Sequence, residues 1–82
     1  MAHSAEMGFN QNPHVAKATV AELSAQNATD EATRCRSWLE AAHLWERAAD
    51  REKNEKRASE YRVHAERAHN EAEPRVATQD RL

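Results

Sequence analysis

Both tryptophans of the chain, Trp38 and Trp45, stand seven residues apart in a stretch that is otherwise mostly alanine and charge. At about 100° per residue they share one narrow helix face with Ala42 and Ala49. The opposite face carries polar and charged side chains: Glu40, His43, Arg47, Asp50 and Arg51. The pattern predicts an amphipathic helix whose indole stripe packs against another helix, and it favours an all-α fold.

The length of 82 residues allows one domain. Few of its side chains are large and apolar, and each one that is fully buried contributes about 1.5–3 kcal/mol. Ordering each residue costs about 1.5 kcal/mol, so a core this thin leaves the net stability near zero. We therefore expect a marginal monomer whose burial is completed by a protein partner or by formation of a homodimer.

The first helix is expected over about residues 14–26. Asn12 is expected to cap this helix, and Pro13 at the first helical position loses nothing by lacking an N–H. A narrow apolar stripe at spacings of 4, 3 and 4 is expected to face the core: Ala16, Val20, Leu23 and Asn27. This stripe is thin, so we expect the helix to order against the rest of the chain.

The second helix is expected over about 30–52, with Thr29 as its N-cap and Cys35 on the tryptophan stripe. Cys35 is expected to be a buried small hydrophobe, with the neighbouring arginines pointing away from it. Ser37-x-x-Glu40 is a capping-box pattern, so a break at 36–37 is the alternative.

The third helix is expected over about 55–73, after a left-handed hinge at Asn54 and before Pro74. Its stripe is almost all methyl groups: Ala58, Tyr61, Ala65, Ala68 and Ala72. The short connection favours an antiparallel helical hairpin. A single helical domain over 13–73, a hairpin or three-helix unit, is thus expected between disordered segments at 1–12 and 74–82.

Charge argues against a nucleic-acid-binding polycation, because 12 basic residues face 14 acidic ones and the net charge is −2. A clustered basic surface is the usual source of such affinity. The basic residues near the second turn are candidate contacts to an acidic partner: Arg47, Arg51, Lys53, Lys56 and Arg57. Direct nucleic-acid binding through these residues, with Arg34 and Arg36, remains the runner-up.

Catalytic and metal chemistry have no constellation in the sequence. His64 and His69 are five apart and do not share a helix face, and only His69 and Glu73 have ligand spacing. No phosphate-binding loop or nucleophile–base pair stands out. We expect neither enzyme activity nor a metal nor a cofactor.

The single cysteine excludes an intrachain disulfide, and no apolar run approaches the ~18 residues of a membrane span. The first residues lack the basic start and apolar stretch of a signal peptide. We expect a protein of the bacterial or host-cell cytoplasm, without membrane contact.

Function is therefore expected to be the binding of another protein. Candidate anchors are the aromatic residues of the helical stripes and the apolar residues beside them: Trp38, Leu44, Trp45, Tyr61 and Val63. Aromatic side chains are favoured as interface anchors, although at helical spacing they more often form a core.

The run Ala41-Ala42-His43-Leu44-Trp45-Glu46-Arg47-Ala48-Ala49, followed by Asn54 and Ala58, resembles the ANR family of small bacterial transcriptional regulators and, more distantly, the PerC-like regulators. The resemblance covers about residues 32–65. Trp38 stands at the family's aromatic position, Trp45 at its tryptophan and Asn54 at its turn asparagine. The glycine before the aromatic, the second tryptophan and the terminal cysteine are absent; Arg57 and Ala65 stand about where the last two would fall.

The resemblance implies a helical regulator that contacts a DNA-associated protein rather than reading bases itself. An alternative from the profile alone is a phage- or mobile-element-encoded inhibitor of a host defence complex, similar to anti-CRISPR proteins in its small size and lack of motifs.

Overall fold

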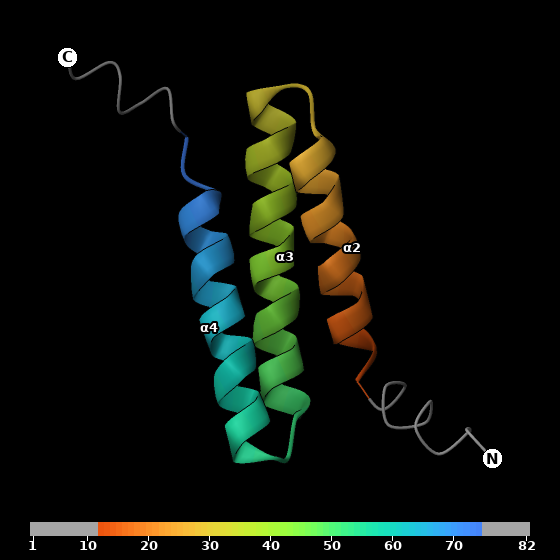
Figure 1. Ribbon diagram of the computed structural model, residues 1–82, viewed down its shortest axis with the longest axis vertical. Helices are drawn as coiled ribbons and strands as arrows, with labels where there is room; N and C mark the ends of the chain where they lie inside the picture. Colours follow the sequence, from red (N-terminus) through yellow and green to blue (C-terminus); the bar gives the residue numbers. More distant parts are fainter. Residues whose placement is uncertain (1–11, 75–82) are drawn as a thin grey trace.

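The computed structural model describes residues 12–74, which form three α-helices and no strand (Figure 1). They are α2 (Pro13–Asn27), α3 (Glu31–Arg51) and α4 (Glu55–Glu71). The expected all-α class is confirmed, and each helix ends within two residues of its predicted bound. The expectations for residues 1–11 and 75–82 lie outside the described residues.

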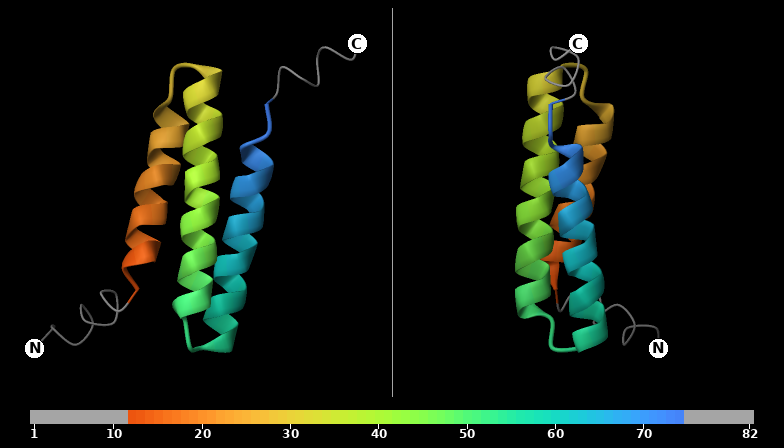
Figure 2. Two further views of the ribbon diagram at one scale, coloured as in Figure 1. Left: turned by 180° about the vertical axis from the view of Figure 1, so that it is seen from behind. Right: turned by 90° about the vertical axis from the view of Figure 1, so that its left-hand side faces the viewer.

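The central helix α3 lies between α2 and α4, and consecutive helices run in opposite directions (Figures 1 and 2). Its 21 residues are continuous, so the alternative of a break at 36–37 is wrong. The predicted antiparallel hairpin of α3 and α4 is present, and α2 adds a second hairpin on the other side of α3. Within residues 12–74, no helix combines the length and apolarity needed to cross a bilayer.

Two of the expected helix starts are wrong in detail. The N-cap of α3 is Asp30, not Thr29, because the Asp30 carboxylate accepts a 2.9 Å hydrogen bond from the Thr33 amide. Asn54 does not adopt a left-handed conformation; with φ −77° and ψ 117° it caps α4 by accepting from the Arg57 amide at 2.9 Å. Each of these side chains accepts a hydrogen bond from a backbone amide in the first turn of the following helix. The bond fixes the residue at which that helix begins.

Asn12 precedes α2 as expected, but its side chain does not cap the helix. Its Nδ2 instead donates to the carbonyl of Ala48 at 3.0 Å, and the side chain is buried. The contact joins the start of α2 to the last turns of α3, so Asn12 contributes to helix packing rather than to helix initiation.

Alanine methyl groups and two indoles make up most of the core. Trp38 and Trp45 are each 6% exposed, and the other buried apolar residues are alanines from all three helices. The predicted α4 stripe is confirmed: its alanines at 58, 65 and 68 are buried, with Tyr61 and Ala72 partly buried beside them. Small side chains let the backbones approach closely around the indoles.

The predicted inward face of α2 is wrong. Val20 and Leu23 are 64% and 52% exposed, and the buried residues are Ala18, Ala21 and Ala25. The indoles of α3 fill the space between the helices, so α2 packs through its smallest side chains. The larger apolar residues of α2 are left on its outer surface.

Trp45 lies on α3 and contacts both of the other helices. Its indole Nε1 donates to Glu22 Oε2 of α2 at 2.7 Å. On the α4 side its ring stacks on His64, with centroids 4.5 Å apart, and lies 5.6 Å from the ring of Tyr61. Burial of Tyr61 raises the pKa of its phenol. This cluster fixes the rotation of α2 and α4 relative to α3.

Candidate functional site

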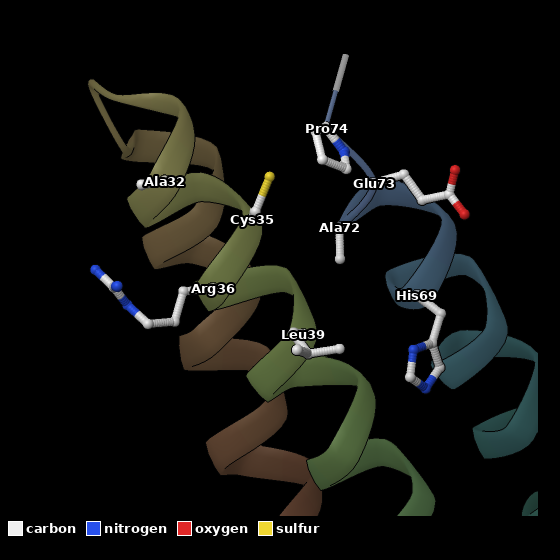
Figure 3. Close-up of a pocket in the computed structure, with 8 residues that line it drawn as sticks. All are labelled: Ala32, Cys35, Arg36, Leu39, His69, Ala72, Glu73 and Pro74. Atoms are coloured by element: carbon white, nitrogen blue, oxygen red, sulfur yellow. The ribbon is translucent and has the colours of Figure 1, made fainter. Parts of the chain in front are cut away.

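The structure has an open groove of about 480 Å³ between the first half of α3 and the end of α4 (Figure 3). Almost all of its accessible lining is apolar, and no residue of α2 contributes to it. Its lining residues are Ala32, Cys35, Arg36 and Leu39 on α3, then His69, Ala72, Glu73 and Pro74 on and after α4.

One wall is an apolar stripe on α3. Ala32, Cys35 and Leu39 follow at spacings of 3 and 4, so they lie on one side of the helix. Figure 3 shows the thiol of Cys35 and the side chain of Leu39 directed toward the gap, whereas Arg36 points away from α4. Leu39 is 42% exposed, which makes it the largest apolar side chain available to a ligand in the groove.

The opposite wall is held in place by Arg34. Its Nη1 donates to the carbonyl of Glu71 at 2.6 Å and its Nη2 to the carbonyl of Glu73 at 3.1 Å. The same guanidinium pairs with Glu31 at 2.8 Å, and this hydrogen bond raises the pKa of Arg34. Carbonyls at a helix C-terminus lack intrahelical partners, so the guanidinium satisfies them while fixing the exit of the chain at Pro74.

Cys35 differs from its expected environment. It is half-buried at the groove rather than enclosed with the tryptophans. Its Sγ lies 3.7 Å from Arg34 Nη2 and 3.8 Å from Glu31 Oε2, so the expectation that the neighbouring arginines point away is wrong for Arg34. A reagent must therefore enter the groove to reach the free thiol of Cys35.

At its other end the groove is bounded by a polar contact between the helices. His69 Nε2 and Glu46 Oε2 are 2.8 Å apart, and the rings of His69 and His43 meet edge to face at 5.9 Å. In the described part of the chain, no three His, Cys, Asp or Glu side chains are placed to hold a metal ion.

The five predicted anchors are not gathered on one surface. Trp38 and Trp45 are buried in the core, and Leu44 and Tyr61 are half-buried against it. Only Val63 is well exposed, at 63%, and it stands on the outer side of α4, two residues from Ala65, which is buried. The tryptophans thus have the role of core residues here.

The predicted charged contacts lie near the turn between α3 and α4 and are interleaved with carboxylates. Arg47, Arg51, Lys53, Lys56 and Arg57 are all exposed. Arg57 lies 3.5 Å from Glu52, whose carboxylate also accepts a hydrogen bond from the Asn54 amide at 3.2 Å. Positively and negatively charged side chains alternate in this region, so the basic residues do not form one cationic patch.

Sequence reasoning missed the groove because its walls belong to elements far apart in the chain. Leu39 is not among the anchors that the sequence predicts. A second apolar stripe on α3, at Ala32, Cys35 and Leu39, was the available signal. The contacts from Arg34 to carbonyls 37 and 39 residues away have no sequence signature.

No family model, curated protein or solved structure matches this chain. The resemblance to the ANR family stays a prediction.

Proposed function

We propose that this protein acts by binding another protein, seating one face of an amphipathic helix from that partner in the groove between α3 and α4. In this proposal it is a regulator or inhibitor that works by contact and performs no chemistry of its own. The observation that carries the proposal is the exposed side chain of Leu39 in an apolar groove whose walls are two antiparallel helices.

The dimensions of the groove support a helical ligand. Its α3 wall runs from Ala32 to Leu39, which is about two turns or 10 Å of helix. Apolar side chains at i, i+3 and i+4 of a bound helix match a groove of this length. The rim carries a positive charge at Arg36 and a negative charge at Glu73. A partner helix with one acidic and one basic side chain is favoured in the orientation that pairs each of them with the opposite charge.

The distribution of charge supports a protein partner over nucleic acid. The helix α3 carries equal numbers of acidic and basic side chains: Glu31, Glu40, Glu46 and Asp50 with Arg34, Arg36, Arg47 and Arg51. The same holds for α4: Glu55, Glu60, Glu66 and Glu71 with Lys56, Arg57, Arg62 and Arg67. Affinity for phosphates depends on an excess of positive charge, which neither helix provides.

The resemblance to ANR regulators supports a partner that is itself a transcription factor. An inhibitor of a defence complex would use the same kind of contact, so the identity of the partner distinguishes the two roles.

The proposal is tested by placing a photo-reactive residue at Leu39 of the full chain and, in a second protein, at Val63. Both positions are exposed and apolar, but only Leu39 lines the groove. We expect one protein of the native host to cross-link from position 39 and not from position 63. Recovery of the same proteins from both positions, or of nucleic acid, would contradict the proposal.

A further inference from the structure

His69 places a strong hydrogen-bonding group in the apolar groove between α3 and α4. Figure 3 shows its imidazole ring across the gap from Leu39, and the ring nitrogen nearer the backbone, Nδ1, lies on the side toward α3. The charged ends of Arg36 and Glu73 are directed away from the gap in the same view. The thiol of Cys35 also faces the gap, but a thiol is a weak hydrogen-bonding group. His69 is therefore the lining residue best placed to recognise a polar group of a ligand.

Glu46 determines which ring nitrogen of His69 carries the hydrogen. Nε2 of His69 lies 2.8 Å from Glu46 Oε2, within hydrogen-bond distance. An ionised carboxylate has no hydrogen to donate, so Nε2 is the donor and holds the hydrogen. In the neutral imidazole the other nitrogen, Nδ1, is then an acceptor. The contact with α3 thus fixes the chemical role of the nitrogen that faces the groove.

Nδ1 is accessible to a ligand. Within residues 12–74, the contact with Glu46 is the only hydrogen bond of the His69 ring, and neither of the buried side-chain atoms that lack a partner belongs to His69. The ring also meets the ring of His43 edge to face at 5.9 Å. Two residues of α3 therefore hold the ring in place, so a ligand spends little free energy on ordering it.

We propose that His69 selects the partner helix by accepting a hydrogen bond at Nδ1 from a neutral donor, either the hydroxyl of serine or threonine or the amide of asparagine. This inference rests on the proposed function, since it names the chemistry of the helix that the groove binds. The donor lies on the same face of that helix as the apolar side chain that contacts Leu39.

Other side chains at the same position of the partner helix fit less well. A charged donor would have to be desolvated by the apolar groove. The oxygens of a carboxylate would oppose the lone pair of Nδ1. Alanine would cover Nδ1 without giving it a donor, and an unpaired acceptor is costly to cover. A neutral donor avoids all three costs.

The state of the ring is measured first, in the full chain without a partner. Nitrogen-15 NMR of histidine-labelled protein at about pH 8, where a histidine ring is ordinarily neutral, shows which nitrogen carries the hydrogen. We expect it on Nε2 of His69. Glu46→Ala is expected to raise the share of rings with the hydrogen on Nδ1, because the acceptor that selects the Nε2 form is gone. A hydrogen on Nδ1 in the wild type, or an unchanged share in the variant, overturns the proposal.

Recognition is measured with synthetic helices. The probe is a displayed library of amphipathic helices about four turns long, with apolar residues fixed at i and i+7 and with i+3 and i+4 randomised on the same face. Selection against the wild type is expected to enrich serine, threonine or asparagine at one of the randomised positions. Selection against His69→Phe, which keeps a ring but has no acceptor, is expected to enrich apolar residues there. Enrichment of the same residues by both proteins overturns the proposal.

A double-mutant cycle separates recognition by His69 from support of the fold. A selected helix, and its counterpart with alanine in place of the donor, are titrated into wild type, His69→Phe and the matched control His43→Phe, whose ring is not among the groove residues. Loss of the donor is expected to weaken binding to wild type and to His43→Phe at least about fivefold, and to change binding to His69→Phe by less than about twofold. An equal loss in all three proteins overturns the proposal.

The variant Leu39→Glu distinguishes failure of this inference from failure of the proposed function. Selected helices that bind Leu39→Glu as tightly as the wild type do not use the groove, and the proposed function is then overturned together with the role of His69. Helices that depend on Leu39 but not on His69 overturn the role of His69 alone.

Discussion

The indole Nε1 of Trp45 donates a 2.7 Å hydrogen bond to Glu22, and this contact determines which side of α2 meets solvent. Val20 and Glu22 are two residues apart and so about 160° apart around the helix. With Glu22 held against Trp45, Val20 must face outward, and Leu23 follows it. A part-buried polar contact therefore leaves the large apolar side chains of α2 on its outer surface.

We expect Trp45→Phe to lower the free energy of unfolding by about 1–3 kcal/mol, since it leaves the Glu22 carboxylate without its donor. Trp38→Phe is the matched control, because Trp38 is equally buried but has no such bond to α2 among residues 12–74. Urea denaturation of both variants measures the difference. Equal losses would show that packing, rather than the hydrogen bond, holds α2.

The Asp30 cap makes part of the stability depend on pH. The hydrogen bond from the Thr33 amide holds the pKa of Asp30 below its usual value of 3.8. A lowered carboxyl pKa in the folded state stabilises the fold above the usual pKa, and this contribution is lost as the pH falls through the lowered one.

Asp30→Asn keeps a side-chain acceptor but cannot titrate. We expect the difference in thermal midpoint between wild type and Asp30→Asn to be constant near neutral pH and to shrink as the pH falls below 3.8 and through the lowered pKa of Asp30. Thermal melts at closely spaced pH values measure it. A difference that stays constant over that range would exclude a contribution from Asp30 ionisation.

Arg34→Met is expected to loosen the end of α4, because the carbonyls of Glu71 and Glu73 lose their donor. Hydrogen exchange at the amides of residues 69–73 should become faster, while exchange in the first turns of α4 stays as in wild type. Arg34→Lys keeps the charge but not the forked geometry and should give an intermediate effect. Unchanged exchange in both variants would mean that α4 ends where it does without Arg34.

Much of the fold followed from the sequence, because helix bounds depend on local features such as Pro13, Asn54 and Pro74. The α4 stripe was also predictable, since alanine packs well against indoles. The rotation of α2 was not, because two stripes compete on that helix and the usual preference for burying larger apolar residues selects the wrong one. Which of the two stripes faces the core depends on the hydrogen bond between Glu22 and Trp45, which are 23 residues apart in the sequence.

The groove was unpredictable for a similar reason. Leu39 is left exposed because Trp38 already occupies the inward position, and the groove it lines exists because Arg34 holds the end of α4 close by. Both facts depend on tertiary contacts rather than on the local pattern.

Cys35 provides a direct reporter of groove occupancy, as the single thiol of the chain. We expect a maleimide to alkylate Cys35 in the protein alone and to do so more slowly once the partner is bound, because the ligand covers the thiol. Mass spectrometry over time gives both rates. The same rate with and without saturating partner would place the partner elsewhere.

The most direct test of the proposed function is a calorimetric titration of the purified partner, identified by cross-linking from position 39, into wild type, Leu39→Glu and Val63→Glu. Leu39→Glu is predicted to weaken binding at least about tenfold by placing a carboxylate in the apolar groove, and Val63→Glu to leave it unchanged. Equal affinities for all three proteins would contradict the claim that the groove between α3 and α4 is the binding site.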